Sequence, residues 1–202
     1  MYKNLSEVLL NGLNFTKGLG FLITLAIATG IAQEYRYHTW EHFVGSGMDR
    51  RAIYLGKYIF AIGLAIVLFL TYTLSAYLTS VGIGKTMRFD QILFVIERGI
   101  IVYATLAGIV VFLSMSSKNY VSGLLFPLAF AFCEKDMLLM MRTLFEKVKI
   151  HTGLLGRYTL LQINAVAPCE GTHVFSEMLL PCVVITIIVT LVGYFLFSKY
   201  EL

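Results

Sequence analysis

Charged side chains are scarce in this sequence, and their scarcity limits what the chain can be. Only 14% of the 202 residues are Asp, Glu, Lys or Arg, whereas 58% are hydrophobic. A soluble domain usually carries about 25% charged residues. The apolar residues form runs of roughly 17 to 28, long enough to cross a hydrocarbon core about 30 Å thick. The composition therefore excludes an ordinary soluble domain and predicts a single membrane domain over residues 1–202.

Basic runs, cysteine pairs and a cleavable leader are also lacking. The net charge of +4 comes from scattered residues, which gives no sign of a nucleic-acid partner. The polar start from Met1 to Glu7 differs from a signal peptide, so the first apolar run is expected to be retained. Cys133, Cys169 and Cys182 have no C-x-x-C spacing, which argues against a structural zinc site. One disulfide among them stays open as an alternative.

Apolar segments separated by polar turns predict an all-α, polytopic transmembrane bundle of about five spans. The expected spans cover residues 19–32, 53–81, 91–115, 118–133 and 179–197. Asp49 is placed to cap the second span, and Pro127 is expected to kink the fourth. The mixed stretch over 134–177 is expected to form an extramembrane lobe.

The segment between the first two spans predicts an amphipathic interfacial helix over residues 34–44. Its two sides would carry Glu34, His38, Glu41 and His42 on one, and Tyr37, Trp40, Phe43 and Val44 on the other. Aromatic residues suit the headgroup layer of a membrane, and the polar side stays available for water or a protein partner. From the residues alone, a partner-binding helix and a plain membrane anchor are equally good interpretations.

The residues in and after this segment resemble those of a known family. This part of the sequence is similar to the cytoplasmic loop of type-2 ABC transporter permeases. The residues that carry the similarity are Glu34-Tyr35-Arg36, Thr39, Gly47, Arg50, Ile53-Tyr54-Leu55 and Lys57. The closing stretch from Gly193 to Lys199 also resembles the last span of such permeases, whereas His38 stands where the family usually has Gly. Family members normally have one more span before the helix that begins here near Leu19. The chain is therefore expected to lack the family's first transmembrane helix.

The resemblance implies a function, which is ATP-driven export by alternating access across the cell membrane. In the family, a separate ABC ATPase binds ATP and contacts a coupling helix of the permease, so no cofactor is expected in this chain. The implied contact residues are Glu34, Arg36, Thr39, Glu41, Arg50 and Arg51. The implied partners are that ATPase, a second permease chain in a homo- or heterodimer, and the lipid bilayer. A peptide, a drug or a lipid-like compound would be the substrate.

Three further patterns point to other chemistry. Residues 38–42, HTWEH, match the zinc-protease pattern H-x-x-E-H, which makes a membrane-bound metalloprotease one alternative. A small, non-transporting immunity or assembly protein is a second alternative.

Residues 79–86 resemble a P-loop but follow an apolar helix where a strand is required, which favours a loop between spans. Glu97 and Arg98 form an intramembrane charged pair, for which a structural role is favoured over substrate contact.

Overall fold

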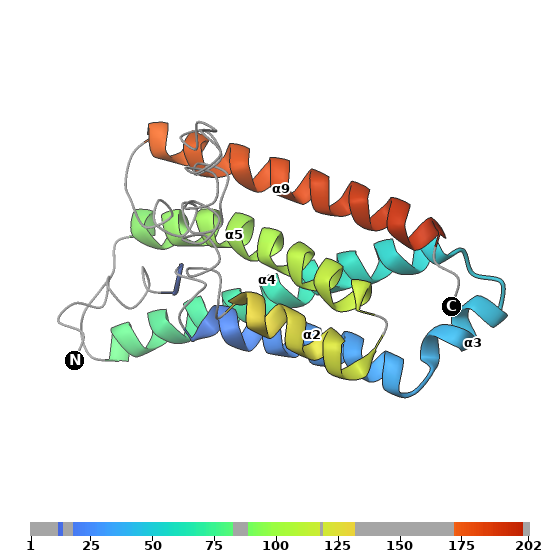
Figure 1. Cartoon of the computed structure of the whole chain (residues 1–202). Coiled ribbons are helices and arrows are strands. Elements are labelled where there is room, and N and C mark those ends of the chain that lie inside the picture. Colours follow the sequence, from blue (N-terminus) through green and yellow to red (C-terminus); the bar gives the residue numbers. More distant parts are fainter. Residues whose placement is uncertain (1–11, 14–17, 83–88, 118, 132–171, 200–202) are drawn as a thin grey trace, which may run out of the picture.

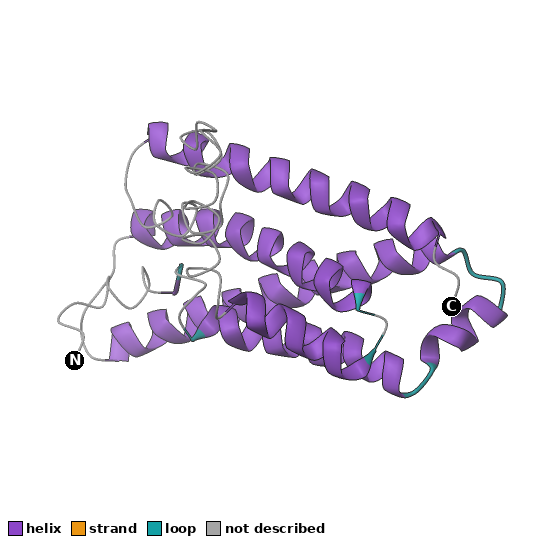
Figure 2. Ribbon diagram, viewed as in Figure 1, coloured by secondary structure: helices purple, strands orange, loops and turns teal. Residues whose placement is uncertain are grey.

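The structure is a computed structural model, and it describes residues 12–13, 18–82, 89–117, 119–131 and 172–199 of the chain. Within these ranges every regular element is an α-helix (Figure 2). The helices are α2 (Leu19–Arg36), α3 (Thr39–Gly45), α4 (Arg50–Gly82), α5 (Phe89–Ser116), an unlabelled helix over Tyr120–Ala131, and α9 (Thr172–Lys199). The prediction of an all-α membrane protein is confirmed.

Three of the described helices are long and apolar enough to cross a membrane. They cover Arg50–Gly82, Ile92–Ser116 and Met178–Phe197, and they correspond to the spans predicted over 53–81, 91–115 and 179–197. The shortest has 20 residues. At about 1.5 Å per residue it reaches roughly 30 Å, the thickness of a hydrocarbon core.

Asp49 caps the first of these long helices, as predicted. Its Oδ1 atom accepts a hydrogen bond of 3.1 Å from the backbone N–H of Arg51. The first N–H groups of a helix have no partner within the helix, so a side-chain oxygen at this place stabilises the helix start.

The other two predicted spans differ in length from the prediction. Helix α2 contains the span expected over 19–32 and continues to Arg36. The span expected over 118–133 appears as the shorter helix Tyr120–Ala131, which includes Pro127. Helix α9 begins at Thr172, within the lobe predicted over 134–177, and the part of that lobe before Thr172 lies outside the described residues.

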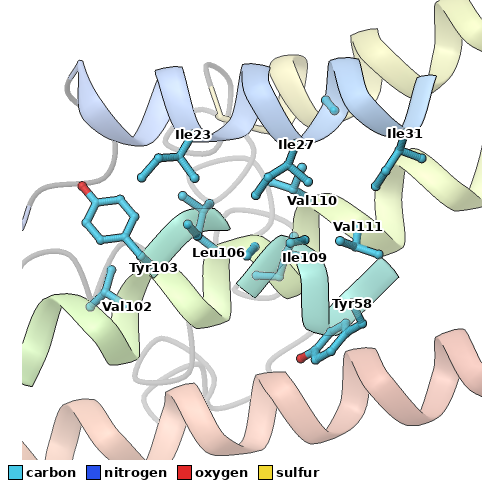
Figure 3. Packing of buried hydrophobic residues seen from close by; sticks show 14 of the residues in the cluster. Ile23, Ile27, Ile31, Tyr58, Val102, Tyr103, Leu106, Ile109, Val110 and Val111 are labelled. Atoms are coloured by element: carbon cyan, nitrogen blue, oxygen red, sulfur yellow. The ribbon is translucent and has the colours of Figure 1, made fainter. Parts of the chain in front are cut away.

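Helix α5 occupies the centre of the bundle. Helices α2, α4 and α9 all pack against it, and Figure 1 shows it running between α9 and α2. Ile23, Ile27 and Ile31 point from α2 toward α5 (Figure 3), and all three are buried. Their spacing of four places them on one helix face. By contrast, α4 and α9 carry many exposed apolar side chains, as helices that face lipid do.

Two glycines allow aromatic rings of α4 to lie directly against the backbones of neighbouring helices. A Cβ atom added to Gly99 of α5 would collide with the ring of Phe69, and one added to Gly193 of α9 would collide with the hydroxyl end of Tyr54. Both rings are fully buried, so neither can move aside freely. Small residues at helix interfaces permit close packing in membranes. These two contacts therefore fix α4 against both α5 and α9.

Replacing Gly99 by alanine is expected to destabilise the bundle. Overpacking a well-filled interface costs about 1–3 kcal/mol, more than the roughly 0.5–1 kcal/mol that alanine gains over glycine in a helix. The matched control is Gly63→Ala, because Gly63 is exposed on α4 and has no atom within 4 Å of its added Cβ. Thermal unfolding in detergent should give a lower midpoint for Gly99→Ala only. Equal midpoints for the two variants would show that Phe69 does not fill this site.

Candidate functional site

One end of the bundle gathers the ends of four helices and the short helix α3. Tyr35, in the last turns of α2, donates a hydrogen bond of 2.9 Å from its hydroxyl to the carbonyl of Met115 near the end of α5. Arg51, at the start of α4, donates one of 3.3 Å to the hydroxyl of Tyr194 near the end of α9. Helix α3 projects at the same end, between two short loops (Figure 2). We call this region the α3 end.

The prediction of one continuous helix over residues 34–44 is wrong, because the chain breaks after Arg36. Residues 34–36 form the last turn of α2, and α3 starts at Thr39. Between them, His38 has φ 54 and adopts the left-handed conformation, which an α-helix cannot continue through. Glycine adopts this conformation with the least strain. This is a physical reason why the resemblance leads one to expect Gly at position 38.

Trp40 fastens α3 to the bundle. Its side chain is only 5% exposed and stacks between the rings of Tyr35, at 5.7 Å, and Phe197, at 6.3 Å between centroids. Phe197 in turn stacks on Tyr54 at 5.1 Å. Such pairs contribute about 0.5–1.5 kcal/mol each beyond the burial of their area. The four rings come from α2, α3, α9 and α4, so α3 is joined to three other helices at once.

An ion pair between Glu34 and Lys57 adds a second connection at this end. It links the last turn of α2 to α4, and both side chains are largely buried, with exposed fractions of 20% and 24%. The Lys57 Nζ atom also lies 5.8 Å from the ring centre of Phe43 in α3. Water screens such a pair less than it screens a surface pair. The carboxylate of Glu34, predicted as a contact for a partner protein, is thus engaged inside this chain.

The remaining predicted contact residues lie around the outer side of the α3 end. Thr39 and Arg50 are half-buried, whereas Arg36, Glu41 and Arg51 are exposed. The carboxylate of Glu41 pairs with the Nδ1 atom of His38 at 2.8 Å. Five of the six residues therefore lie at least partly exposed at the α3 end, and the Glu34 carboxylate is paired within the chain.

The geometry around HTWEH gives no support to a zinc site. His38 Nδ1 is engaged by Glu41, and no three His, Cys, Asp or Glu side chains in the described part of the chain are placed to hold a metal ion. Cys182 is a buried free thiol, while Cys133 and Cys169 lie outside the described residues. In the stretch that resembles a P-loop, Thr79 belongs to α4 and its hydroxyl donates to the carbonyl of Ser75 at 2.8 Å, so helix stands where a strand would be needed.

The charged residues within α5 have different surroundings although they are adjacent in sequence. Arg98 is buried, with its guanidinium carbon 4.1 Å from the ring centre of Phe94. Glu97 is exposed. A cation over an aromatic face gains electrostatic stabilisation, which offsets part of the cost of leaving water. The two side chains therefore differ in burial, and their joint role stays a prediction.

The sequence interpretation overlooked the residues that hold α3 in place. Lys57 and Phe197 both belong to segments quoted for the family resemblance, but a resemblance does not state which side chains touch. Phe197 is 157 positions after Trp40, a separation at which helical periodicity carries no information on contacts. The signal in the sequence for a distant packing partner is the single tryptophan of the chain, Trp40, in the short segment between two apolar runs.

The fold and the α3 end define a class of protein, a helical membrane domain with a short helix fixed across the ends of its long helices. The family model described as ABC-2 family transporter protein matches residues 2–134, well over half of the chain. The chain belongs to this family, and it is a membrane-embedded permease domain rather than an enzyme. ABC-2 permeases work with ABC ATPases. Searches of curated proteins and of solved structures give no match.

Removing the ring of Phe197 is expected to expose Trp40, which is the only tryptophan of the chain. Without its stacking partner, the indole gains contact with water, and its fluorescence emission should shift to longer wavelength in Phe197→Ala. Phe195→Ala is the matched control, because Phe195 is 61% exposed two residues away on the same helix. Its emission should match that of the unmodified protein. An identical spectrum for all three proteins would contradict the stack.

Proposed function

We propose that this chain is the permease subunit of an ATP-driven exporter, and that α3 is the coupling helix through which a separate ABC ATPase drives it. The burial of Trp40 carries the proposal. A helix of seven residues is too short to be stable alone in water, so its position depends on what it packs against. Force applied to the outer side of α3 would reach α2, α4 and α9 together through the stacked rings.

We place the centre of the ATPase contact on Thr39 and Glu41, with Arg50 beside them. Glu41 has an exposed fraction of 66% in its side chain and lies one residue after the buried Trp40, about 100° further round α3. A helix that buries one side and exposes the other suits a groove in a partner protein. Glu34, Arg36 and Arg51 would support this surface from within the chain, because each has a partner there.

The transport cycle would be alternating access by two permease chains with the α3 end in the cytoplasm. ATP binding shifts such an equilibrium only if the ATPase pair prefers the α3 positions of one state over those of the other. A rigid connection from α3 to α4 and α9 would convert that preference into helix movement. The exported compound would be a peptide, a drug or a lipid-like compound, as the family resemblance implies.

Glu97 and Arg98 receive a structural role in this proposal. Arg98 is buried in the most central helix and stacks on Phe94, which lies one turn earlier on the same helix. An arginine held in this way stabilises the packing of α5 and need not contact a substrate.

Charge reversal on the outer side of α3 tests the proposal. When the permease is purified from its own membranes, an ABC ATPase should accompany it, recognised by its nucleotide-binding motifs and by hydrolysis of Mg·ATP. Glu41→Arg should reduce the recovered ATPase about tenfold or more, because like charges placed against each other at an interface cost several kcal/mol. Glu41→Gln, which keeps the size of the side chain, should reduce it less.

The emission of Trp40 serves as the control for an intact α3 end and should be unchanged in both variants. Recovery of the same amount of ATPase with Glu41→Arg would contradict the proposed contact. Absence of any ABC ATPase from the unmodified preparation would contradict the proposed function itself.

A further inference from the structure

Two exposed arginines at the α3 end are held against tyrosine rings. The guanidinium carbon of Arg51 lies 5.0 Å from the ring centre of Tyr194, whose hydroxyl also accepts its hydrogen bond. The guanidinium carbon of Arg36 lies 5.7 Å from the ring centre of Tyr120 and 5.9 Å from that of Tyr37. A stacked guanidinium keeps donors free at its edge, and its orientation is already limited by the ring.

The carboxylates described at this end do not pair with the guanidinium group of either arginine. Glu34 pairs with Lys57, Glu41 pairs with His38, and Asp49 accepts from the backbone N–H of Arg51. In the described part of the chain, no carboxylate lies within ion-pair distance of either stacked arginine. Their positive charge is therefore available to an anion from outside the chain, and the planar guanidinium group matches a phosphate group especially well.

Exposed apolar side chains lie near the tyrosines that the two arginines contact. Within one turn of Tyr194 on α9 are Leu191 and Phe195, with exposed fractions of 52% and 61%. Next to Tyr120 on its helix is Val121, with 58%. Tyrosine marks the boundary between headgroups and hydrocarbon in membrane proteins. Each arginine therefore sits where a polar headgroup would meet its own acyl chains.

We propose that Arg36 and Arg51 are two binding sites for anionic phospholipids, each holding a headgroup phosphate while the acyl chains cover the neighbouring apolar residues. Figure 1 shows α9 along one edge of the bundle and α2 along the opposite edge, so the two sites lie on opposite flanks of the α3 end. A negatively charged leaflet attracts basic residues at its surface. The proposal does not depend on whether α3 binds an ATPase.

Lipid titration of the purified permease in neutral detergent tests this inference. Phosphatidylglycerol should raise the thermal unfolding midpoint, whereas phosphatidylcholine and inorganic phosphate at equal concentration should not. In Arg36→Gln and in Arg51→Gln the lipid concentration needed for half of the effect should rise about tenfold, the loss expected for one charge-assisted hydrogen bond. For Arg51→Lys this lipid concentration should lie between those of the unmodified protein and Arg51→Gln, because lysine keeps the charge but lacks the planar group.

Arg50→Gln is the matched control, since it removes the same charge one residue away from Arg51, and no tyrosine ring is placed against Arg50 in the described structure. It should respond to phosphatidylglycerol as the unmodified protein does. An equal loss in Arg50→Gln would show general attraction by charge and overturn the two sites. An equal response to inorganic phosphate would overturn a lipid as the ligand. If Arg36→Gln and Arg51→Gln respond normally to lipid but lose the ATPase, these arginines contact the ATPase and the inference is wrong.

Discussion

The burial of one indole ring is the constraint on which the α3 end depends. Helix α3 has seven residues and follows a residue with positive φ, so neither its length nor its connection to α2 fixes its direction. Trp40 does so by stacking on rings from α2 and α9. The ion pair of Glu34 with Lys57 connects α2 to α4 in the same region. A surface helix is thereby made a rigid part of a membrane bundle, and this rigidity is what a coupling role requires.

The same contacts continue into the part of the bundle that crosses the membrane. Tyr54 stacks on Phe197, lies against Gly193, and donates a hydrogen bond of 3.2 Å to the carbonyl of Val189. Further along α4, Phe69 lies against Gly99 of α5. Lipid supplies no hydrophobic force between helices, so close packing and hydrogen bonds must hold them together. A displacement of α3 is therefore expected to pass to α4 and α9 as whole helices.

The sequence predicted the long helices well and the α3 end only in part. Continuous apolar runs identify α4, α5 and α9 because their length alone matches the bilayer. The break at His38 escaped prediction, since the apolar pattern continues across it and a left-handed residue leaves no periodic signal. Phe197 and Lys57 escaped as partners because tertiary packing, rather than local pattern, brings them to Trp40 and Glu34.

Determining the side of the membrane on which α3 lies tests the proposed coupling role of this helix most directly. A single reactive cysteine can be placed by Glu41→Cys after Cys133, Cys169 and Cys182 are replaced by serine, and a maleimide that does not cross membranes can then be added to sealed vesicles. We expect labelling in inside-out vesicles, protection there when the ATPase is bound, and no labelling in right-side-out vesicles. Labelling from the outer side, or failure to label in either orientation, would contradict a coupling role for α3.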